Sequence, residues 1–302
     1  MRQLTHLYLI KGQLAMRPID LHVHSNKSDG SNTPEELVQL AIAKDLSAFA
    51  LTDHDTVDGI DAALAYAARL RADGAANVPE VIPGIELSTE YYGKDIHLVG
   101  LYIDHNSPAF RAQLKHFVDS RVERNRKMCA NLAEAGIDIS YEKLVEAFPD
   151  SVLTRAHYAV YLVDHGYSLS KEDAFSQYLG DHTKYFVPRE KITPEMGVEL
   201  ILQAGGIPIL AHPVLYRMSD ARLNELVARL KAAGLVGIEA IYATYNQAEE
   251  RQMRKLAEKY DLCISGGSDY HGVAKPGLEM GTGYRKLFVP EDLLWKLKQY
   301  RK

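Results

Sequence analysis

Residues of the types that bind metal ions recur where short apolar segments of this chain end. The first such segment, residues 19–24, alternates apolar side chains with Asp20, His22 and His24. On a β-strand alternate side chains share a face, so these three polar groups are expected to point the same way. Two imidazoles one residue apart can chelate a single cation. An isolated HxH pair is structural or incidental at least as often as it binds a metal. The metal-binding interpretation therefore depends on whether other segments end in the same residue types.

Five further segments bring ligand-type residues to the ends of predicted strands. They are His54 after SAFALT, Glu86 closing VIPGIEL, His97 within DIHLVG, His212 after GIPILA, and Asp269 and His271 in LCISGGSDYH. In β/α barrels the carboxyl ends of the strands form the active-site face, so these groups are expected to meet on one surface. A mixture of histidine and carboxylate suits zinc, manganese or iron, and more than four such ligands predicts more than one ion.

The order of the predicted elements favours an α/β fold with a helical insertion. Strand-like runs and helices alternate over residues 17–106, an almost wholly helical stretch covers residues 107–206, and the alternation resumes over residues 207–302. Thr33 and Glu36 predict a capping box on the first helix. The strand–helix–strand opening favours a parallel sheet, and about seven strands in all predict an incomplete (β/α) barrel, with an open doubly wound sheet as the alternative. Residues 1–15 are predicted to be an appendage or the result of an ambiguous start site.

Charge and cysteine content limit the partners and the compartment. A formal net charge of -5 gives no electrostatic footprint for duplex DNA, so phosphate binding would rely on the positive charge of a bound metal. Cys129 and Cys263 cannot form a disulfide framework, which favours a reducing, cytoplasmic compartment. The apolar run near the start is too short to cross a bilayer, so no membrane association is expected. The sequence gives no prediction of the oligomeric state.

Six motifs resemble those of the PHP (polymerase and histidinol phosphatase) family. They are DLHVHSNKSDG, ALTDHDT, GIEL, IHLVG, AHP and SDYH, in this order from Asp20 to His271. The resemblance implies a distorted (β/α)7-type barrel. The helical stretch between IHLVG and AHP is similar to that of the small nucleotide phosphoesterases of the family. That branch includes 3',5'-nucleoside bisphosphate phosphatases and enzymes that trim short RNA from its 5' end.

The resemblance also implies two or three divalent ions (Mn, Fe or Zn) and the side chains that hold them. The implied ligands are His22, His24, Glu86 and Asp269 for a first ion, Asp29, His54 and His271 for a second, and His97 and His212 with Glu86 for a third. Glu86 would in addition bridge the first two ions. Asp29 depends on the resemblance, because KSDGS is also typical of a simple turn. Every ligand position is filled, so the motifs give no sign of an inactive member.

Four side chains of the helical stretch are candidates for substrate binding. Arg121 and Arg124 lie three residues apart on one face of a predicted helix, and Arg155 and His157 lie near the start of another. Guanidinium groups suit phosphate oxygens. The resemblance implies that this stretch caps the barrel mouth and holds the part of the substrate that is not cleaved. The alternative is an ordinary solvated helix face.

The chain is therefore predicted to be a metal-dependent phosphoesterase. In this hypothesis a hydroxide that bridges two ions attacks phosphorus, and no separate general acid is assigned. The expected substrates are 3',5'-nucleoside bisphosphates, with short 5'-phosphorylated single-stranded RNA as a further candidate. Three alternatives stay open: a histidinol-phosphate-type phosphatase, a non-catalytic metal-stabilised module and a metal-dependent amidohydrolase.

Overall fold

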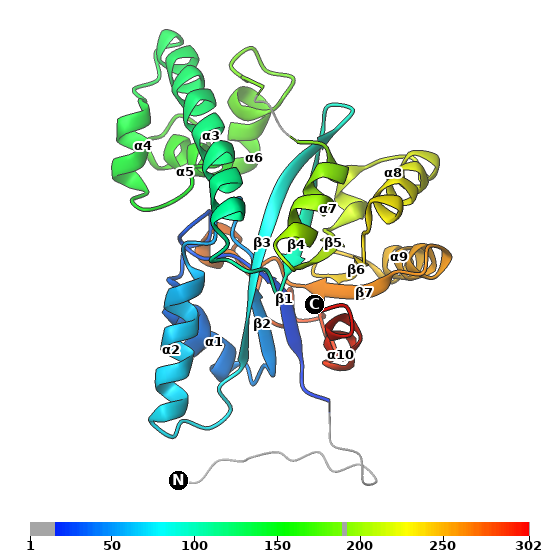
Figure 1. Ribbon diagram of the computed structural model, residues 1–302. Coiled ribbons are helices and arrows are strands. Elements are labelled where there is room, and N and C mark those ends of the chain that lie inside the picture. Colours follow the sequence, from blue (N-terminus) through cyan, green and yellow to red (C-terminus); the bar gives the residue numbers. More distant parts are fainter. Residues whose placement is uncertain (1–15, 189–191, 302) are drawn as a thin grey trace.

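The computed structural model describes residues 16–188 and 192–301, so the predicted appendage, residues 1–15, lies outside the described residues. One sheet of seven strands, in chain order from β1 to β7, forms the centre of this part of the chain (Figure 1). The strands are β1 (Ile19–Val23), β2 (Ala48–Leu51), β3 (Glu80–Tyr91), β4 (Lys94–Leu101), β5 (Ile207–Leu210), β6 (Gly237–Tyr242) and β7 (Cys263–Gly267).

A hairpin between β3 and β4 makes the sheet mixed rather than parallel. Tyr92 and Gly93 connect the two strands with φ values of 50° and 74°. Two consecutive residues with positive φ are typical of the turns whose twist suits a two-residue hairpin. Such a short connection leaves no room for a helix, so β4 runs antiparallel to β3 and to β5, while the other neighbouring pairs are parallel.

The sheet nearly closes into a barrel where β1 meets the end of β7. Val23 pairs with Tyr270, and the backbone N–H of His24 donates a hydrogen bond of 2.9 Å to the Tyr270 carbonyl. Glycine is required at position 267, because an added Cβ would lie 2.4 Å from the Cβ of His22. The predicted barrel-like α/β architecture is thereby confirmed in preference to an open sheet.

Apolar side chains cover both faces of the sheet. On one face Leu21, Ile82 and Ile209 belong to a buried cluster that includes residues of the last helix, α10 (Asp292–Lys298). On the other face a larger cluster joins the sheet to the surrounding helices. These helices are α1 (Pro34–Ala43), α2 (Ile60–Ala72), α7 (Pro194–Gln203), α8 (Asp220–Ala233) and α9 (Gln247–Lys259). The predicted capping box of Thr33 and Glu36 is present at the start of α1.

Residues 108–187, called the insertion below, lie between β4 and α7 and carry helices that stand beyond the strand ends (Figure 1). These helices are α3 (Pro108–Glu134), α4 (Tyr141–Ala147), α5 (Arg155–Asp164), α6 (Lys171–Ala174) and the π-helix η1 (Phe175–Leu179). A separate buried cluster runs from Met128 to Leu179. Helix α7 and the first half of α3 pack on the outer face of the barrel, and the division of the chain at residues 107 and 206 stays a prediction. No helix in the described part of the chain combines the length and apolarity needed to cross a bilayer.

Candidate metal centre

A bulge in β1 sets the direction of its polar side chains. Asp20 pairs with Phe49 and Val23 pairs with Leu51, so three residue steps on β1 match two on β2. The extra residue breaks the alternation along the strand. The expectation that Asp20 shares a face with the two histidines of this segment is therefore wrong. Its buried carboxylate instead accepts hydrogen bonds of 2.8 Å and 2.5 Å from the backbone N–H and the hydroxyl of Ser268.

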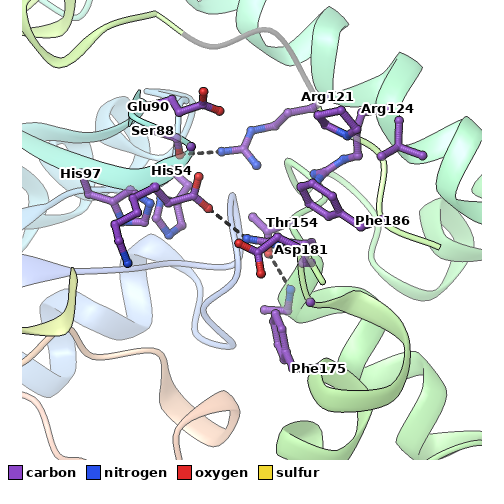
Figure 2. Close-up of a pocket in the computed structure, with 18 of the residues that line it drawn as sticks. His54, Ser88, Glu90, His97, Arg121, Arg124, Thr154, Phe175, Asp181 and Phe186 are labelled. Carbon is purple, nitrogen blue, oxygen red and sulfur yellow. Dashed lines mark hydrogen bonds and ion pairs between the residues drawn. The ribbon is translucent and has the colours of Figure 1, made fainter. Parts of the chain in front are cut away.

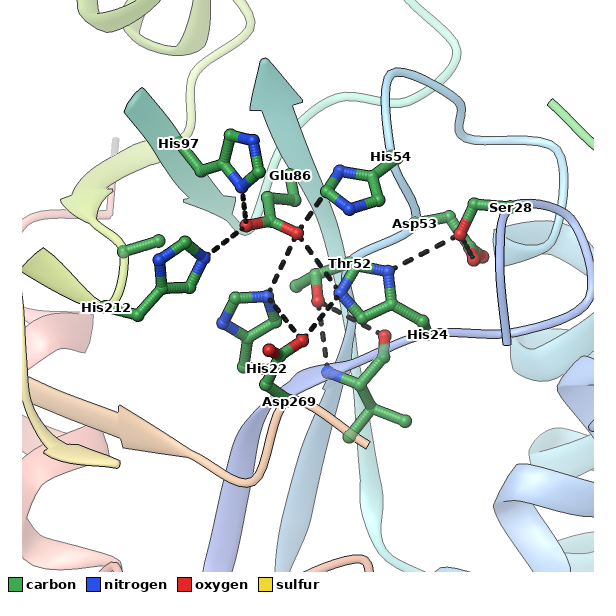
Figure 3. Close-up of polar contacts among 12 residues, drawn as sticks. His22, His24, Ser28, Thr52, Asp53, His54, Glu86, His97, His212 and Asp269 are labelled. Carbon is green, nitrogen blue, oxygen red and sulfur yellow. Dashed lines mark hydrogen bonds and ion pairs between the residues drawn. The ribbon is translucent and has the colours of Figure 1, made fainter. Parts of the chain in front are cut away.

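The nine predicted ligands come together at the barrel mouth, and Figure 3 shows those that surround Glu86. Eight of them form three overlapping groups, in each of which the potential ligand atoms lie within 4.8 Å of one another. The groups are His22, His24, Glu86 and Asp269; His24, Asp29, His54 and His271; and His54, Glu86 and His97. His212, the ninth, places Nε2 2.9 Å from Oε1 of Glu86. The convergence agrees with the arrangement implied by the motifs, and the binding of ions to these groups stays a prediction.

Glu86 lies at the centre of these groups and is almost completely buried. Its Oε1 is 2.8 Å from Nδ1 of His97, in addition to its contact with His212. Its Oε2 is 3.2 Å from Nε2 of His22, 3.2 Å from Nε2 of His24 and 3.3 Å from Nδ1 of His54. One carboxylate with imidazoles on both oxygens is suited to bridge neighbouring cations.

Several imidazole nitrogens lie close to the Glu86 oxygens but form no hydrogen bond of normal geometry with them or with any other group. They are Nε2 of His22, Nε2 of His24, Nδ1 of His54 and Nδ1 of His97, all buried. A buried polar atom without a partner is destabilising, because it loses its hydrogen bond to water and gains nothing in exchange. Divalent cations in the groups of His22, His24, Glu86 and Asp269 and of His54, Glu86 and His97 would satisfy all of them. The donor set therefore fits zinc, manganese or iron, which histidine and carboxylate ligands prefer.

The carboxylates keep protons on two of the histidines in the ion-free protein. Burial opposes a charge on His22, but the carboxylates of Glu239, Glu86 and Asp269 outweigh it and raise the pKa of His22 well above its ordinary value. Burial likewise opposes a charge on His24, yet the neighbouring carboxylates of Asp269 and Glu86 raise its pKa to about 9. For His54 burial prevails and lowers the pKa to about 3. An incoming cation must therefore displace protons from His22 and His24.

Asp269 is held so that one carboxylate oxygen faces the histidines. Its Oδ2 accepts hydrogen bonds of 2.5 Å from the Tyr242 hydroxyl and 2.5 Å from the Lys275 ammonium group. Its Oδ1 lies 3.3 Å from Nε2 of His24. Asp269 has φ of 55°, and His212 has φ of 28°. Non-glycine residues in this region are strained by about 1–3 kcal/mol, and such strain is concentrated at functional sites.

Sequence reasoning missed Glu239, which contacts two of the predicted ligand residues through atoms other than their metal-facing nitrogens. Its Oε1 lies 2.9 Å from Nδ1 of His22, and its Oε2 accepts a 2.7 Å hydrogen bond from the backbone N–H of His212. With Nδ1 protonated and donating to Glu239, the lone pair of His22 Nε2 is directed at the centre. A signal was present in the sequence, because Glu239 interrupts the apolar strand GIEAIY.

Two carboxylates next to His54 have structural roles. Asp53 accepts hydrogen bonds from the loop after β1, including 2.6 Å from the Ser28 hydroxyl. Asp55 accepts a 2.9 Å hydrogen bond from Nε of Arg121 and a shorter one from its Nη2, so this buried pair ties α3 to the barrel. Arg121 also donates a 2.8 Å hydrogen bond to the Ser88 hydroxyl.

A cavity of about 710 Å³ lies between the metal centre and the insertion (Figure 2). Asp29, His54 and His97 line it on the side of the centre. Three of the four predicted substrate-binding residues line it as well, namely Arg121, Arg124 and Arg155. Their binding of substrate stays a prediction, and for Arg121 much of the guanidinium group is already engaged by Asp55 and Ser88.

His157 is not among the residues that line this cavity, so the predicted contact with substrate has no support from its position. Its ring is buried, and Nδ1 accepts a 2.9 Å hydrogen bond from the backbone N–H of Thr154 in the capping box that begins α5. Burial, together with the weaker repulsion of Arg121, lowers the pKa of His157 despite opposing contributions from Asp29 and the Ser28 carbonyl. The ring therefore holds the backbone at the start of α5, and its contact with substrate stays a prediction.

A nearly closed barrel with a buried histidine and carboxylate centre at its mouth is typical of metal-dependent hydrolases. Comparison with known proteins identifies the family within that class. The family model described as PHP domain matches residues 20–138. The chain belongs to the PHP domain family, as its similarity to the relatives below shows.

Three relatives match nearly the full length of the chain. A 5'-3' exoribonuclease of Haemophilus influenzae is 37% identical over 252 residues, which are 83% of this chain and 89% of the relative. A 3',5'-nucleoside bisphosphate phosphatase of Chromobacterium violaceum is 34% identical and covers 88% of this chain and 91% of the relative. A solved structure of an amidohydrolase from Chromobacterium violaceum, with bound sulfate and no metal, has a TM-score of 0.82 at 32% identity and covers 94% of this chain and 96% of that one.

Proposed function

We propose that this protein hydrolyses phosphate esters of nucleotides with the help of two or three divalent ions, of which manganese, iron and zinc suit the ligands. The observation that carries the proposal is the position of the cavity. Asp29, His54 and His97 belong both to the candidate ion groups and to the cavity wall, so a substrate in the cavity reaches the ions directly. Bound divalent ions would polarise a phosphoryl oxygen and lower the pKa of water.

The insertion side of the cavity suits a second phosphate. Arg124 and Arg155 line the cavity from the insertion and bring positive charge opposite the carboxylate-rich centre, and Lys94 of β4 lines it from the barrel. Arg155 donates a 2.9 Å hydrogen bond to Asp95 and a 3.2 Å hydrogen bond to the Leu179 carbonyl, which orient its guanidinium group. Planar guanidinium groups bind phosphate through paired hydrogen bonds. A substrate with one phosphate at the centre and another at these cations would match both ends of the cavity.

Two aromatic side chains in the cavity wall suit the nucleoside. Phe175 and Phe186 line the cavity, and the guanidinium carbon of Arg155 lies 5.9 Å and 5.3 Å from their ring centroids (Figure 2). Aromatic rings stack on nucleobases with little dependence on sequence. Cations and aromatic rings in one wall therefore favour a nucleotide over a small phosphate ester.

The relatives agree with this choice of substrate. One is named for 3',5'-nucleoside bisphosphates and another for RNA that is degraded from the 5' end. For this chain we propose 3',5'-nucleoside bisphosphates as the main substrates and short 5'-phosphorylated single-stranded RNA as a further one. The free thiols of Cys129 and Cys263 fit a reducing, cytoplasmic setting.

Hydrolysis in the presence of Mn²⁺ tests the proposal, with inorganic phosphate measured for the phosphate monoesters and the released nucleotides or amine measured by chromatography for RNA and the amide. The substrates are 3',5'-bisphosphoadenosine, AMP, a short 5'-phosphorylated RNA and histidinol phosphate, with an amide substrate as a control for amidohydrolase activity. We expect the bisphosphate to be turned over most efficiently. Preference for histidinol phosphate, or activity confined to the amide, would overturn the proposal.

The variant Arg155→Ala tests the second phosphate site. It removes charge-assisted hydrogen bonds and should raise KM for 3',5'-bisphosphoadenosine by about 10- to 100-fold. Arg126→Ala is the matched control, because Arg126 is an exposed arginine of α3 that pairs with Glu142 outside the cavity. Equal KM values for the two variants would argue against a phosphate site at Arg155.

A further inference from the structure

Asp29, one of the predicted ligands, lies on a loop between β1 and α1 and not on a strand. The barrel holds this loop from one side through Asp53. The Asp53 carboxylate accepts hydrogen bonds of 2.8 Å from the backbone N–H of Ser25, 2.6 Å from its hydroxyl and 2.6 Å from the Ser28 hydroxyl. These contacts fix the backbone of the loop. The Ser28 hydroxyl also lies 3.5 Å from Oδ1 of Asp29, but its one proton has the closer acceptor in Asp53, at 2.6 Å, and Oδ2 of Asp29 receives no contact from Asp53 or Ser28.

The insertion holds the same loop from the other side. The Ser151 hydroxyl donates a 2.6 Å hydrogen bond to the Asn26 carbonyl, and the backbone N–H of Val152 donates a 2.9 Å hydrogen bond to the Lys27 carbonyl. Two residues further on, the Thr154 hydroxyl lies 3.2 Å from Oδ2 of Asp29. A short stretch of the insertion therefore runs alongside the metal-binding loop and ends on a predicted ligand.

The single hydroxyl proton of Thr154 is directed to Asp29. The other acceptor within reach is Nδ1 of His157, at 3.3 Å, but that nitrogen already accepts the backbone N–H of Thr154 at 2.9 Å. The Thr154 oxygen in turn accepts a 3.2 Å hydrogen bond from the backbone N–H of Ala156 as the cap of α5. A hydroxyl has one proton to donate. Because Nδ1 of His157 already accepts another hydrogen bond, the proton of the Thr154 hydroxyl goes to the Asp29 carboxylate.

We infer that Thr154 is a positioning residue that makes the insertion part of the metal centre. By holding Oδ2 of Asp29, it leaves Oδ1 facing the histidines, 3.1 Å from Nε2 of His271. The ion that Thr154 influences is the one at the group of His24, Asp29, His54 and His271. This inference rests on the proposed ion binding. It adds that the affinity of this one group is set by a residue from the helical insertion.

Titration of the chelator-treated full chain with Mn²⁺ tests the inference, with bound ions counted from the electron paramagnetic resonance signal of free Mn²⁺. Thr154→Val removes the hydroxyl at nearly constant volume. It should weaken one class of ion site by about 10- to 100-fold, which is usual when a hydrogen bond to a ligand is lost, and leave another class unchanged. Thr154→Ser keeps the hydroxyl and should bind ions as the unaltered protein does. Thr154→Ala repeats the test if valine disturbs folding.

Ser140→Ala is the matched control for loss of a helix cap. Ser140 caps α4 in the insertion by accepting a 3.1 Å hydrogen bond from the backbone N–H of Lys143, and it belongs to none of the candidate ion groups. Unchanged Mn²⁺ binding by Thr154→Val, or equal weakening by Ser140→Ala or Thr154→Ser, would overturn the inference while leaving the proposed function intact. Failure of the unaltered protein to bind Mn²⁺, Fe²⁺ or Zn²⁺ would overturn the proposed function itself, and the inference with it.

Discussion

Replacing Glu239 by glutamine should weaken the metal centre without touching a predicted ligand. Each Glu239 oxygen has its own donor, His22 Nδ1 at 2.9 Å and the His212 backbone N–H at 2.7 Å. Glutamine has one acceptor oxygen and one NH₂ group, so one of these donors loses its partner. If the NH₂ group faces Nδ1 of His22, the ring proton moves to Nε2, and that nitrogen can no longer bind a cation.

The magnitude follows from the burial of this contact. Leaving a buried donor without a partner costs about 1–3 kcal/mol. Changes in hydrogen-bonded partners of metal ligands usually lower metal affinity by about 10- to 100-fold. At about 1.4 kcal/mol for each factor of ten, this loss corresponds to about 1.4–2.8 kcal/mol. The first cost lowers the stability of the folded protein with or without ions, whereas the second range applies to ion binding, so Glu239→Gln is expected to lower Mn²⁺ affinity by one to two orders of magnitude.

Calorimetric titration of chelator-treated protein with Mn²⁺ measures the effect. Glu80→Gln is the matched control, because Glu80 also has two donors, the Tyr102 hydroxyl at 2.9 Å and Lys298 at 2.6 Å, but belongs to no candidate ion group. Circular dichroism checks that both variants are folded. Wild-type Mn²⁺ affinity in folded Glu239→Gln, or the same weakening in Glu80→Gln, would refute the reasoning.

Three further outcomes are expected. His22→Ala and Asp269→Ala should each abolish nearly all phosphate release with an unchanged circular dichroism spectrum, and full activity in either would contradict the assigned chemistry. Arg121→Ala removes the positive charge that faces the buried carboxylate of Asp55, which keeps its 2.8 Å hydrogen bond from the backbone N–H of Ser88, and should lower the free energy of unfolding by about 3–5 kcal/mol in denaturant titrations; an effect under about 1 kcal/mol would show that the pair does not hold α3 to the barrel. The pKa of His24 lies at about 9, above the ordinary 6.5, so its stabilisation of the ion-free protein is complete below pH 6.5 and is lost as the pH rises through 9. Over the same window Mn²⁺ affinity should rise, because fewer protons have to be displaced, and a flat profile in calorimetry would argue against this coupling.

The sequence predicted the general architecture because local patterns determine strands and helices. Alternating runs of apolar residues gave the strands on either side of the insertion, and the capping box at Thr33 and Glu36 marked the start of α1 correctly. The antiparallel hairpin at Tyr92 and Gly93 was missed, because the strand–helix order suggested a parallel sheet. The packing of α7 on the barrel could not be predicted, since an amphipathic helix pattern does not say which neighbour it will cover.

The residue types and their order along the chain determined the candidate ligands, because histidine and carboxylate groups at strand ends have few other uses in such numbers. Only the tertiary structure decided which groups support them. Glu239 lies 217 residues from His22, and Thr154 lies 125 residues from Asp29. The bulge that separates Asp20 from the histidines depends on pairing with β2. A hydrogen bond is specified by the distance and direction between two atoms, and for residues so far apart in sequence those quantities exist only after the barrel has closed and the insertion has packed against its mouth.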